Sequence, residues 1–275
     1  MSREHITFDC EGETLTGTID HGKRSSGLLI VSGGNEIRSG TFSGQAKLTA
    51  EIAAQGFPCF RFDRRGVGDS SGINRGFTQS AKDIAAAVAI FREKCPSIKR
   101  LVAFGNCDAA TALVLFAPQE CDTLVLANPW TLEDGQDGWQ PMAIRERYAK
   151  KLRNPSEWLR LVKGQVSLRD LTINLFKVLQ KDTQPLSLAK ELIEKLQREP
   201  RKTSILIAER DRTGQAFLSY WTGGNHSLSI CNDASHAFVE PHARQWLRDK
   251  LIASLEHEEA RQFDMGGPTE LSDGA

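Results

Sequence analysis

Short apolar runs alternate along the chain with segments whose apolar residues recur at the period of a helix. Helical periodicity occupies residues 42–55, 78–94, 108–116 and 241–255. This alternation is typical of a mostly parallel sheet whose strands are joined by crossover helices. The sequence therefore predicts the α/β class, with helices flanking a central sheet. The runs that we interpret as its strands are residues 27–31, 58–62, 100–104, 123–127, 204–208 and 227–231.

The alternation breaks between about residues 135 and 200, where several helical patterns follow one another with no convincing strand. A helical segment between two strands of one sheet indicates a cap inserted into the core domain. We therefore predict a core of residues 1–134 and 200–257 and a helical cap of residues 135–199. Residues 258–275 are polar and rich in glycine towards the end, which is typical of a flexible tail.

The charge and the cysteines exclude several classes of function. The 35 basic and 35 acidic side chains cancel, which argues against nucleic acid or an anionic membrane as a partner held by net charge. No apolar stretch approaches the length of a membrane span, and the first residues lack the apolar core of a signal peptide. The six cysteines are scattered without a paired spacing, so we expect reduced thiols, a cytoplasmic location and no metal site. We also expect no organic cofactor, and no pattern indicates an oligomeric state.

The most informative segment lies between the strand at 100–104 and the helix at 108–116, where Cys107 stands between Gly105 and Ala109. A strand, a sharp turn and a helix in the pattern Gly-x-nucleophile-x-Gly form the nucleophile elbow of α/β-hydrolases. The tight turn requires small residues two before and two after the nucleophile, and Ala109 replaces the usual glycine. A free cysteine is more often a small buried residue. Here, however, the start of a helix favours the thiolate, so we predict that Cys107 is the nucleophile.

A base and an acid follow in the order that this fold uses, which is nucleophile, acid, histidine. His236 lies directly after the strand at 227–231 and before the last helix, and we predict that it is the base. Asp211 follows the strand at 204–208 and is the predicted acid that orients it. Glu209, on the same loop, is the competing acid.

The oxyanion hole is expected to combine the backbone N–H of Asp108 with one from the loop after the strand at 27–31. Gly33 and Gly34 in this loop would let backbone donors approach a substrate closely. Gly34 and Asn35 are the two candidates for the second donor. The loop of residues 63–72, with its glycines and carboxylates, is expected to shape a turn near the site.

Several of these segments together resemble one family. They are Gly33-Gly34-Asn35-Glu36-Ile37-Arg38-Ser39-Gly40, the run from Arg61 to Gly72, and Gly105-Asn106-Cys107-Asp108-Ala109-Ala110. Together with the stretch at residues 157–164 they resemble the exosortase-A-system-associated hydrolases of the first type. The run from Arg61 to Gly72 alone is shared widely with the serine-aminopeptidase and lysophospholipase-like branch. The resemblance implies an α/β-hydrolase fold with a cysteine nucleophile, associated with bacterial exopolysaccharide and protein-sorting systems.

These observations predict a hydrolase of the esterase or thioesterase type, with no metal and a small-molecule acyl ester, thioester or lactone as its substrate. Cys107 would attack the carbonyl, and a thioester acyl-enzyme would then be released by water. An acyltransferase would use the same three side chains until an acceptor replaced water. A ligand-binding module without catalysis, built on the same fold, is the third possibility.

Overall fold

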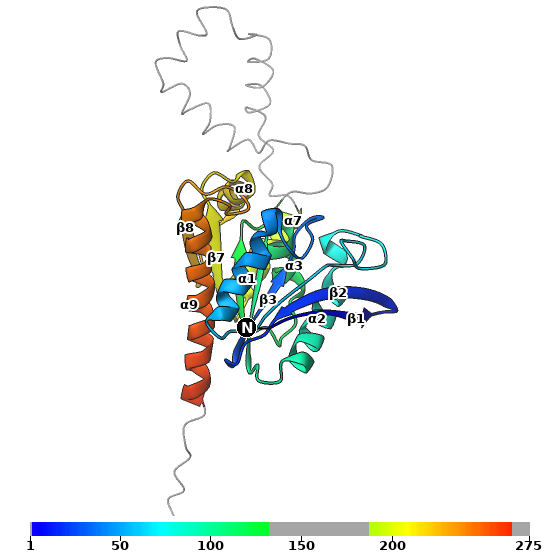
Figure 1. The fold of residues 1–275 in the computed structure, drawn as a ribbon. Coiled ribbons are helices and arrows are strands. Elements are labelled where there is room, and N and C mark those ends of the chain that lie inside the picture. Colours follow the sequence, from blue (N-terminus) through cyan, green and yellow to red (C-terminus); the bar gives the residue numbers. More distant parts are fainter. Residues whose placement is uncertain (1, 132–186, 266–275) are drawn as a thin grey trace, which may run out of the picture.

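The computed structural model describes residues 2–131 and 187–265, which form an eight-stranded sheet with helices on both faces (Figure 1). The strand order is β1-β2-β4-β3-β5-β6-β7-β8, and pairing is parallel from β4 to β8. The predicted α/β class, with a mostly parallel sheet, is confirmed. The strands are β1 Arg3–Cys10, β2 Glu13–Asp20, β3 Ser26–Val31, β4 Cys59–Phe62, β5 Arg100–Asn106, β6 Thr123–Ala127, β7 Lys202–Ala208 and β8 Ser227–Cys231.

Six α-helices and two short 3₁₀ turns are described. They are α1 Gly44–Ala54, α2 Ala81–Lys94, α3 Asp108–Phe116, α7 Ser187–Arg198, α8 Arg212–Tyr220, α9 Pro241–Met265, η1 Thr41–Ser43 and η2 Phe77–Gln79. Among these helices, none is long and apolar enough to cross a membrane.

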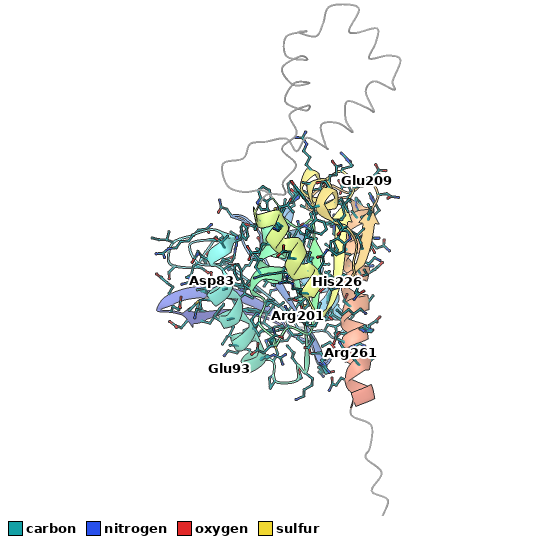
Figure 2. All side chains as sticks on the ribbon, turned by 180° about the vertical axis from the view of Figure 1, so that it is seen from behind. Asp83, Glu93, Arg201, Glu209, His226 and Arg261 are labelled. Carbon is teal, nitrogen blue, oxygen red and sulfur yellow. The ribbon has the colours of Figure 1, made fainter. Side chains whose placement is uncertain are left out.

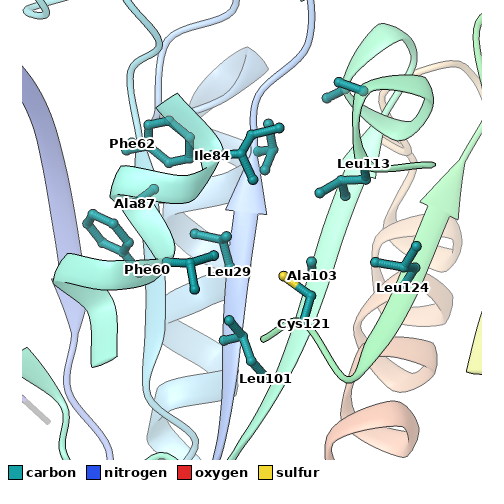
Figure 3. Packing of buried hydrophobic residues seen from close by; sticks show 14 of the residues in the cluster. Leu29, Phe60, Phe62, Ile84, Ala87, Leu101, Ala103, Leu113, Cys121 and Leu124 are labelled. Atoms are coloured by element: carbon teal, nitrogen blue, oxygen red, sulfur yellow. The ribbon is translucent and has the colours of Figure 1, made fainter. Parts of the chain in front are cut away.

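The central strands are buried on both faces, so alternate side chains enter two separate cores. On β5, Leu101 and Ala103 join the cluster under α2, α3, α7 and α8, while Val102 and Phe104 join the cluster under α1 and α9. Figure 3 shows the first of these clusters around Leu29, Phe60 and Ala103. In β3, β5 and β6 this double burial produces continuous apolar runs in the sequence. All six predicted strands are present, although in β8 only the last residue is buried and the apolar residues alternate with serines.

Two strands at the start of the chain were not predicted. β1 pairs antiparallel with β2, which in turn pairs antiparallel with β4. Ile6, Phe8 and Cys10 point into the core and alternate with more exposed residues, which is the period of a strand covered on one face. The sequence of β1 therefore does carry a strand pattern, but it is the alternating pattern of a half-exposed edge strand and not a continuous apolar run.

The end of the chain differs from the predicted flexible tail, because α9 continues through Met265. Glu258 is fully buried and accepts a hydrogen bond of 2.7 Å from Thr123 Oγ1. Glu259 pairs with Arg24 across the start of β3. The polar residues that suggested a tail are thus partners of the core, and only residues 266–275 of that segment lie outside the described part.

Most of the predicted cap, residues 135–186, lies outside the described residues. Its last part forms α7, and there Leu192 and Leu196 are fully buried in the cluster that also holds α3. This helix therefore belongs to the layer that covers the sheet, and the core resumes before the predicted residue 200.

Candidate active site

Cys107 stands at the junction of β5 and α3 with φ of 64° and ψ of −128°. A positive φ is strained for a residue other than glycine, and such strain is concentrated at functional sites. The turn is tight, because a Cβ on Gly105 would lie 2.7 Å from the carbonyl of Ala109. Ala109 itself is fully buried, so the predicted need for small residues on both sides of Cys107 agrees with the packing.

Among the six cysteines, all of which lie in the described residues, Cys107 alone is partly exposed. Burial raises the pKa of Cys10 and that of Cys95 to about 11. Burial likewise raises the pKa of Cys59, Cys121 and Cys231. These five thiols stay neutral near pH 7, and the accessible sulfur is the one at the elbow.

His236 and Asp211 come together from the loops after β8 and β7. His236 Nδ1 lies 3.0 Å from Asp211 Oδ1. The other carboxylate oxygen, Oδ2, accepts the backbone N–H of Gly214 at 2.9 Å and so caps the start of α8. Asp211 is thus buried with both oxygens engaged, which fixes the direction in which it holds the imidazole.

The surroundings raise the pKa of His236 to about 10. The hydrogen bond to Asp211 is the largest cause, a hydrogen bond with the side chain of Cys107 adds to it, and burial opposes both. Because Asp211 engages Nδ1, Nε2 is the imidazole nitrogen left for the sulfur. An imidazolium beside a thiol can stabilise a thiolate and can later donate a proton to a leaving group.

Glu209, the competing acid, has a different partner. Its side chain is exposed, and Oε2 accepts the backbone N–H of Asp233 at 2.8 Å. Glu209 lies at the carboxyl edge of the sheet, at the opposite end of the molecule from Arg261 (Figure 2). The structure therefore brings Asp211, and not Glu209, to the imidazole.

Two asparagines that sequence analysis missed anchor the histidine loop. Asn128, fully buried after β6, donates to Asn106 Oδ1 at 3.0 Å and to the carbonyl of His236 at 3.2 Å. Its own Oδ1 accepts the backbone N–H of Ala208 at 2.8 Å. Asn106 donates to the same carbonyl of His236 at 3.0 Å. An asparagine directly after a predicted strand was the available signal, because asparagine tolerates the positive φ of 43° found at position 128.

The predicted oxyanion loop approaches the elbow closely. A Cβ on Gly33 would lie 2.7 Å from the carbonyl oxygen of Asn106 and 2.7 Å from Asp108 Oδ1, so only glycine fits there. Gly34 has φ of 54°, and its backbone N–H donates to Asp108 Oδ1 at 2.7 Å. The side chain of Asn35 accepts from Asn74 at 2.7 Å. The structure thus brings Gly34 to Asp108, but the carboxylate of Asp108 occupies the N–H of Gly34, and the side chain of Asn35 is paired with Asn74 instead.

The loop of residues 63–72 forms a tight turn beside this site. Asp63 is fully buried and accepts hydrogen bonds from the backbone and the guanidinium of Arg38. It also accepts the backbone N–H of Asp69 at 3.1 Å. Arg64, the next residue, reaches the oxyanion loop, where its Nη2 donates to the carbonyl of Gly34 at 2.6 Å.

A cavity of about 380 Å³ lies beside the elbow, between α1, α9 and the histidine loop. Asn106 and Ala237, the neighbours of Cys107 and His236, are among its lining residues. The lining combines apolar and polar side chains, which suits an acyl or alcohol group with a polar end. The apolar ones are Leu48, Phe104, Phe238, Leu247 and the exposed Phe42 and Val239, and the polar ones include Glu36, Gln45, Lys47 and Arg244. Among the described residues, no group of three or more His, Cys, Asp or Glu side chains could hold a metal ion.

A mostly parallel sheet flanked by helices, with a positive-φ elbow after a central strand and a histidine loop after the last strand, defines an α/β-hydrolase. Within that class, the family model described as serine aminopeptidase, S33, matches residues 23–241, and the chain belongs to this family. A comparison with curated proteins found no match.

Three solved structures illustrate the likeness of fold. The α/β-hydrolase GrgF from Penicillium sp. sh18 is 16% identical with a TM-score of 0.65, covering 94% of this chain and 100% of its own. The esterase Pf2001 of Pyrococcus furiosus is 16% identical with a TM-score of 0.60, and the match covers 94% of this chain and 92% of the esterase chain. Est1E from Butyrivibrio proteoclasticus, solved with ferulic acid bound, is 13% identical with a TM-score of 0.61, and the match covers 93% of this chain and 99% of the Est1E chain. At these identities the likeness concerns the fold.

Proposed function

We propose that this chain is a hydrolase that cleaves a carboxylic ester, a thioester or a lactone through a thioester acyl-enzyme on Cys107. One observation carries the proposal: a partly exposed sulfur sits in a strained elbow at a helix N-terminus, in contact with an imidazole that Asp211 holds. Esterases among the proteins of similar fold are consistent with this chemistry. The substrate is a small molecule with an acyl group.

The reaction follows from the roles of the three side chains. Cys107 Sγ, as the thiolate, attacks the carbonyl carbon, and the negative charge moves to the carbonyl oxygen. When the tetrahedral intermediate collapses, the carbon–oxygen or carbon–sulfur bond of the leaving group breaks, and His236 Nε2 protonates that group. Water then attacks the carbonyl carbon of the thioester, and His236 takes the proton of the water. The carbon–sulfur bond breaks, which releases the carboxylic acid and restores the thiolate of Cys107. Asp211 stabilises the imidazolium in the steps in which His236 is protonated.

The backbone N–H of Asp108, at the start of α3, is one donor to the oxyanion in this proposal. The second comes from Gly34 or Asn35. The N–H of Asp108 is a strong donor because a helix N-terminus presents unpaired N–H groups.

The physiological setting is proposed from the resemblance to the exosortase-A-system-associated hydrolases of the first type. That resemblance favours a bacterial enzyme associated with exopolysaccharide or protein-sorting systems, and the scattered cysteines favour the cytoplasm. The resemblance names no substrate.

The test is the intact mass of the protein after brief exposure to p-nitrophenyl acetate at neutral pH and quenching in acid. Wild type is expected to carry one acetyl group, Cys107→Ala none, and His236→Ala a slowly formed one. Cys231→Ala is the matched control, because it removes a buried thiol at the end of β8, and it should be acetylated like wild type. Equal acetylation of wild type and Cys107→Ala would overturn the proposal. Faster turnover with an added alcohol, without extra free acid, would instead identify an acyltransferase.

A further inference from the structure

The backbone N–H of Gly34 lies where an oxyanion donor is expected, yet it is already engaged. It donates to Asp108 Oδ1 at 2.7 Å. A carboxylate in this position carries a full negative charge beside the carbonyl oxygen that becomes negative during acylation. As long as it stays there, the donor is unavailable and the charge opposes the transition state.

Arg64 lies directly behind this contact. Its side chain is only 4% exposed, and its Nη2 donates to the carbonyl of Gly34 at 2.6 Å. The same Nη2 is 3.7 Å from Asp108 Oδ2, which is an ion pair but too long for a hydrogen bond. Nη1 is buried and has no hydrogen-bond partner within the part of the chain that the structure describes. A buried guanidinium nitrogen without a partner is costly, and a carboxylate is the acceptor that fits its paired donors best.

We propose that Asp108 is a positioning residue with two sites, the Gly34 N–H in the resting enzyme and the Arg64 guanidinium when a substrate carbonyl binds. The inference rests on the proposed acylation of Cys107. Movement of the carboxylate by about 1 Å towards Arg64 would turn the 3.7 Å contact into a hydrogen bond. That one movement gives Arg64 Nη2 a carboxylate acceptor, brings the carboxylate nearer to the guanidinium that carries the unpartnered Nη1, and releases the Gly34 N–H. It also neutralises the carboxylate while the oxyanion forms.

Two features make the movement feasible. The side chain of Asp108 is 15% exposed, so it is not locked in the core. Its own backbone N–H belongs to the first turn of α3 and keeps its place when the side chain rotates. The oxyanion hole would then consist of the N–H of Asp108 and that of Gly34, which decides between Gly34 and Asn35 in favour of Gly34.

The experiment compares two reactions of Cys107 in each variant. The acetylation rate is measured from the burst of p-nitrophenol released from p-nitrophenyl acetate, and it requires an oxyanion hole. Alkylation by iodoacetamide forms no oxyanion, so it reports whether the thiol and the fold are intact. The variants are Arg64→Met, Asp108→Ala and the double variant. Arg65→Met is the matched control, because it removes the adjacent arginine, whose partners are Asp83 and Glu11.

Arg64→Met should slow acetylation by about tenfold or more, because the carboxylate loses its second site and stays near the oxyanion. Asp108→Ala should be acetylated at least as fast as wild type. The acetylation rate of the double variant should match that of Asp108→Ala within about threefold, because Arg64 has no carboxylate to bind once Asp108 is replaced. All variants, including Arg65→Met, should react with iodoacetamide like wild type.

Slower acetylation of Asp108→Ala, with no recovery in the double variant, would overturn the inference and make the Gly34 contact a support of the loop. If Arg64→Met does not fold, Asp108→Ala alone decides: acetylation slower than that of wild type, with normal alkylation by iodoacetamide, would overturn the inference. A wild type that is never acetylated at Cys107 contradicts the proposed function itself. If wild type is acetylated but Asp108→Ala is acetylated more slowly than Arg64→Met, only the role of Asp108 is contradicted.

Discussion

Asp211 connects two elements through one carboxylate, since Oδ1 lies 3.0 Å from His236 Nδ1 while Oδ2 accepts the N–H of Gly214 at 2.9 Å. The acid is therefore held by the helix that it caps. Because the same side chain orients the imidazole, the position of α8 and the ionisation of His236 are linked. This link lets the catalytic and the structural contributions of Asp211 be separated by substitution.

Asp211→Asn should impair acylation without unfolding the protein. Asparagine caps a helix about as well as aspartate, so the midpoint of urea unfolding should fall only by the lost interaction with protonated His236, and this loss should vanish above about pH 10. The neutral amide no longer stabilises the imidazolium, and acetylation of Cys107 should slow by about tenfold or more, equivalent to about 1.4 kcal/mol in the barrier. Glu209→Gln, on the same loop, is the control and should be acetylated like wild type. Equal rates for both variants would contradict the role assigned to Asp211.

The raised pKa of His236 predicts how stability depends on pH. Its folded value of about 10 lies above the ordinary value of 6.5, so folding favours the protonated form. The stabilisation is complete below about pH 6.5 and is lost as the pH rises through about 10. The difference in unfolding free energy between wild type and His236→Gln should therefore shrink between these limits. Urea titrations at pH 6, 8 and 10 measure it, and a difference that grows with pH would contradict the direction of the shift.

The parts of the fold that could be predicted share a physical cause. Strands buried on both faces leave continuous apolar runs, and β3, β5 and β6 were recognisable for that reason. β1 was missed because only one of its faces is covered, so its apolar residues alternate with exposed ones. The end of α9 was missed because its polar residues, Glu258 and Glu259, have partners far away in the sequence.

The site divides in a similar way. Cys107, Asp211 and His236 could be singled out because each follows a strand in an order that the topology dictates. The contact between Asp108 and Gly34 could not, since it joins residues 74 positions apart through the close approach of a loop to the start of α3. Nor could the network of Asn128, whose three partners come from different strand ends. Sequence patterns report local structure and burial, whereas these contacts depend on tertiary distances.

Asn128→Ala should loosen the histidine loop. The substitution removes both hydrogen bonds that Asn128 donates and leaves the buried N–H of Ala208 without its acceptor. An unsatisfied buried group costs about 1–3 kcal/mol, so unfolding in urea should shift accordingly. Acetylation of Cys107 should slow as well, because His236 loses one of the two donors to its carbonyl.

Asn232→Ala is the control for Asn128→Ala, since the side chain of Asn232 is exposed next to the same loop. It should leave both the stability and the acetylation rate near the wild-type values. An Asn128→Ala protein as stable and as reactive as this control would contradict the anchoring role of the asparagine.

Glycine substitutions can test whether the close approach of the oxyanion loop and the elbow is required. On Gly33 a Cβ would lie 2.7 Å from Asn106 O and from Asp108 Oδ1, whereas on Gly44, at the start of α1, it would meet nothing within 4 Å. Gly33→Ala should therefore destabilise the fold by about 1–3 kcal/mol, the usual cost of overpacking. It should also slow acetylation, because the loop must move away from Cys107. Gly44→Ala has room and a helical φ of −62°, so it should be neutral or stabilising. Similar urea midpoints and acetylation rates for the two alanine variants would mean that the loop can retreat from the elbow without loss.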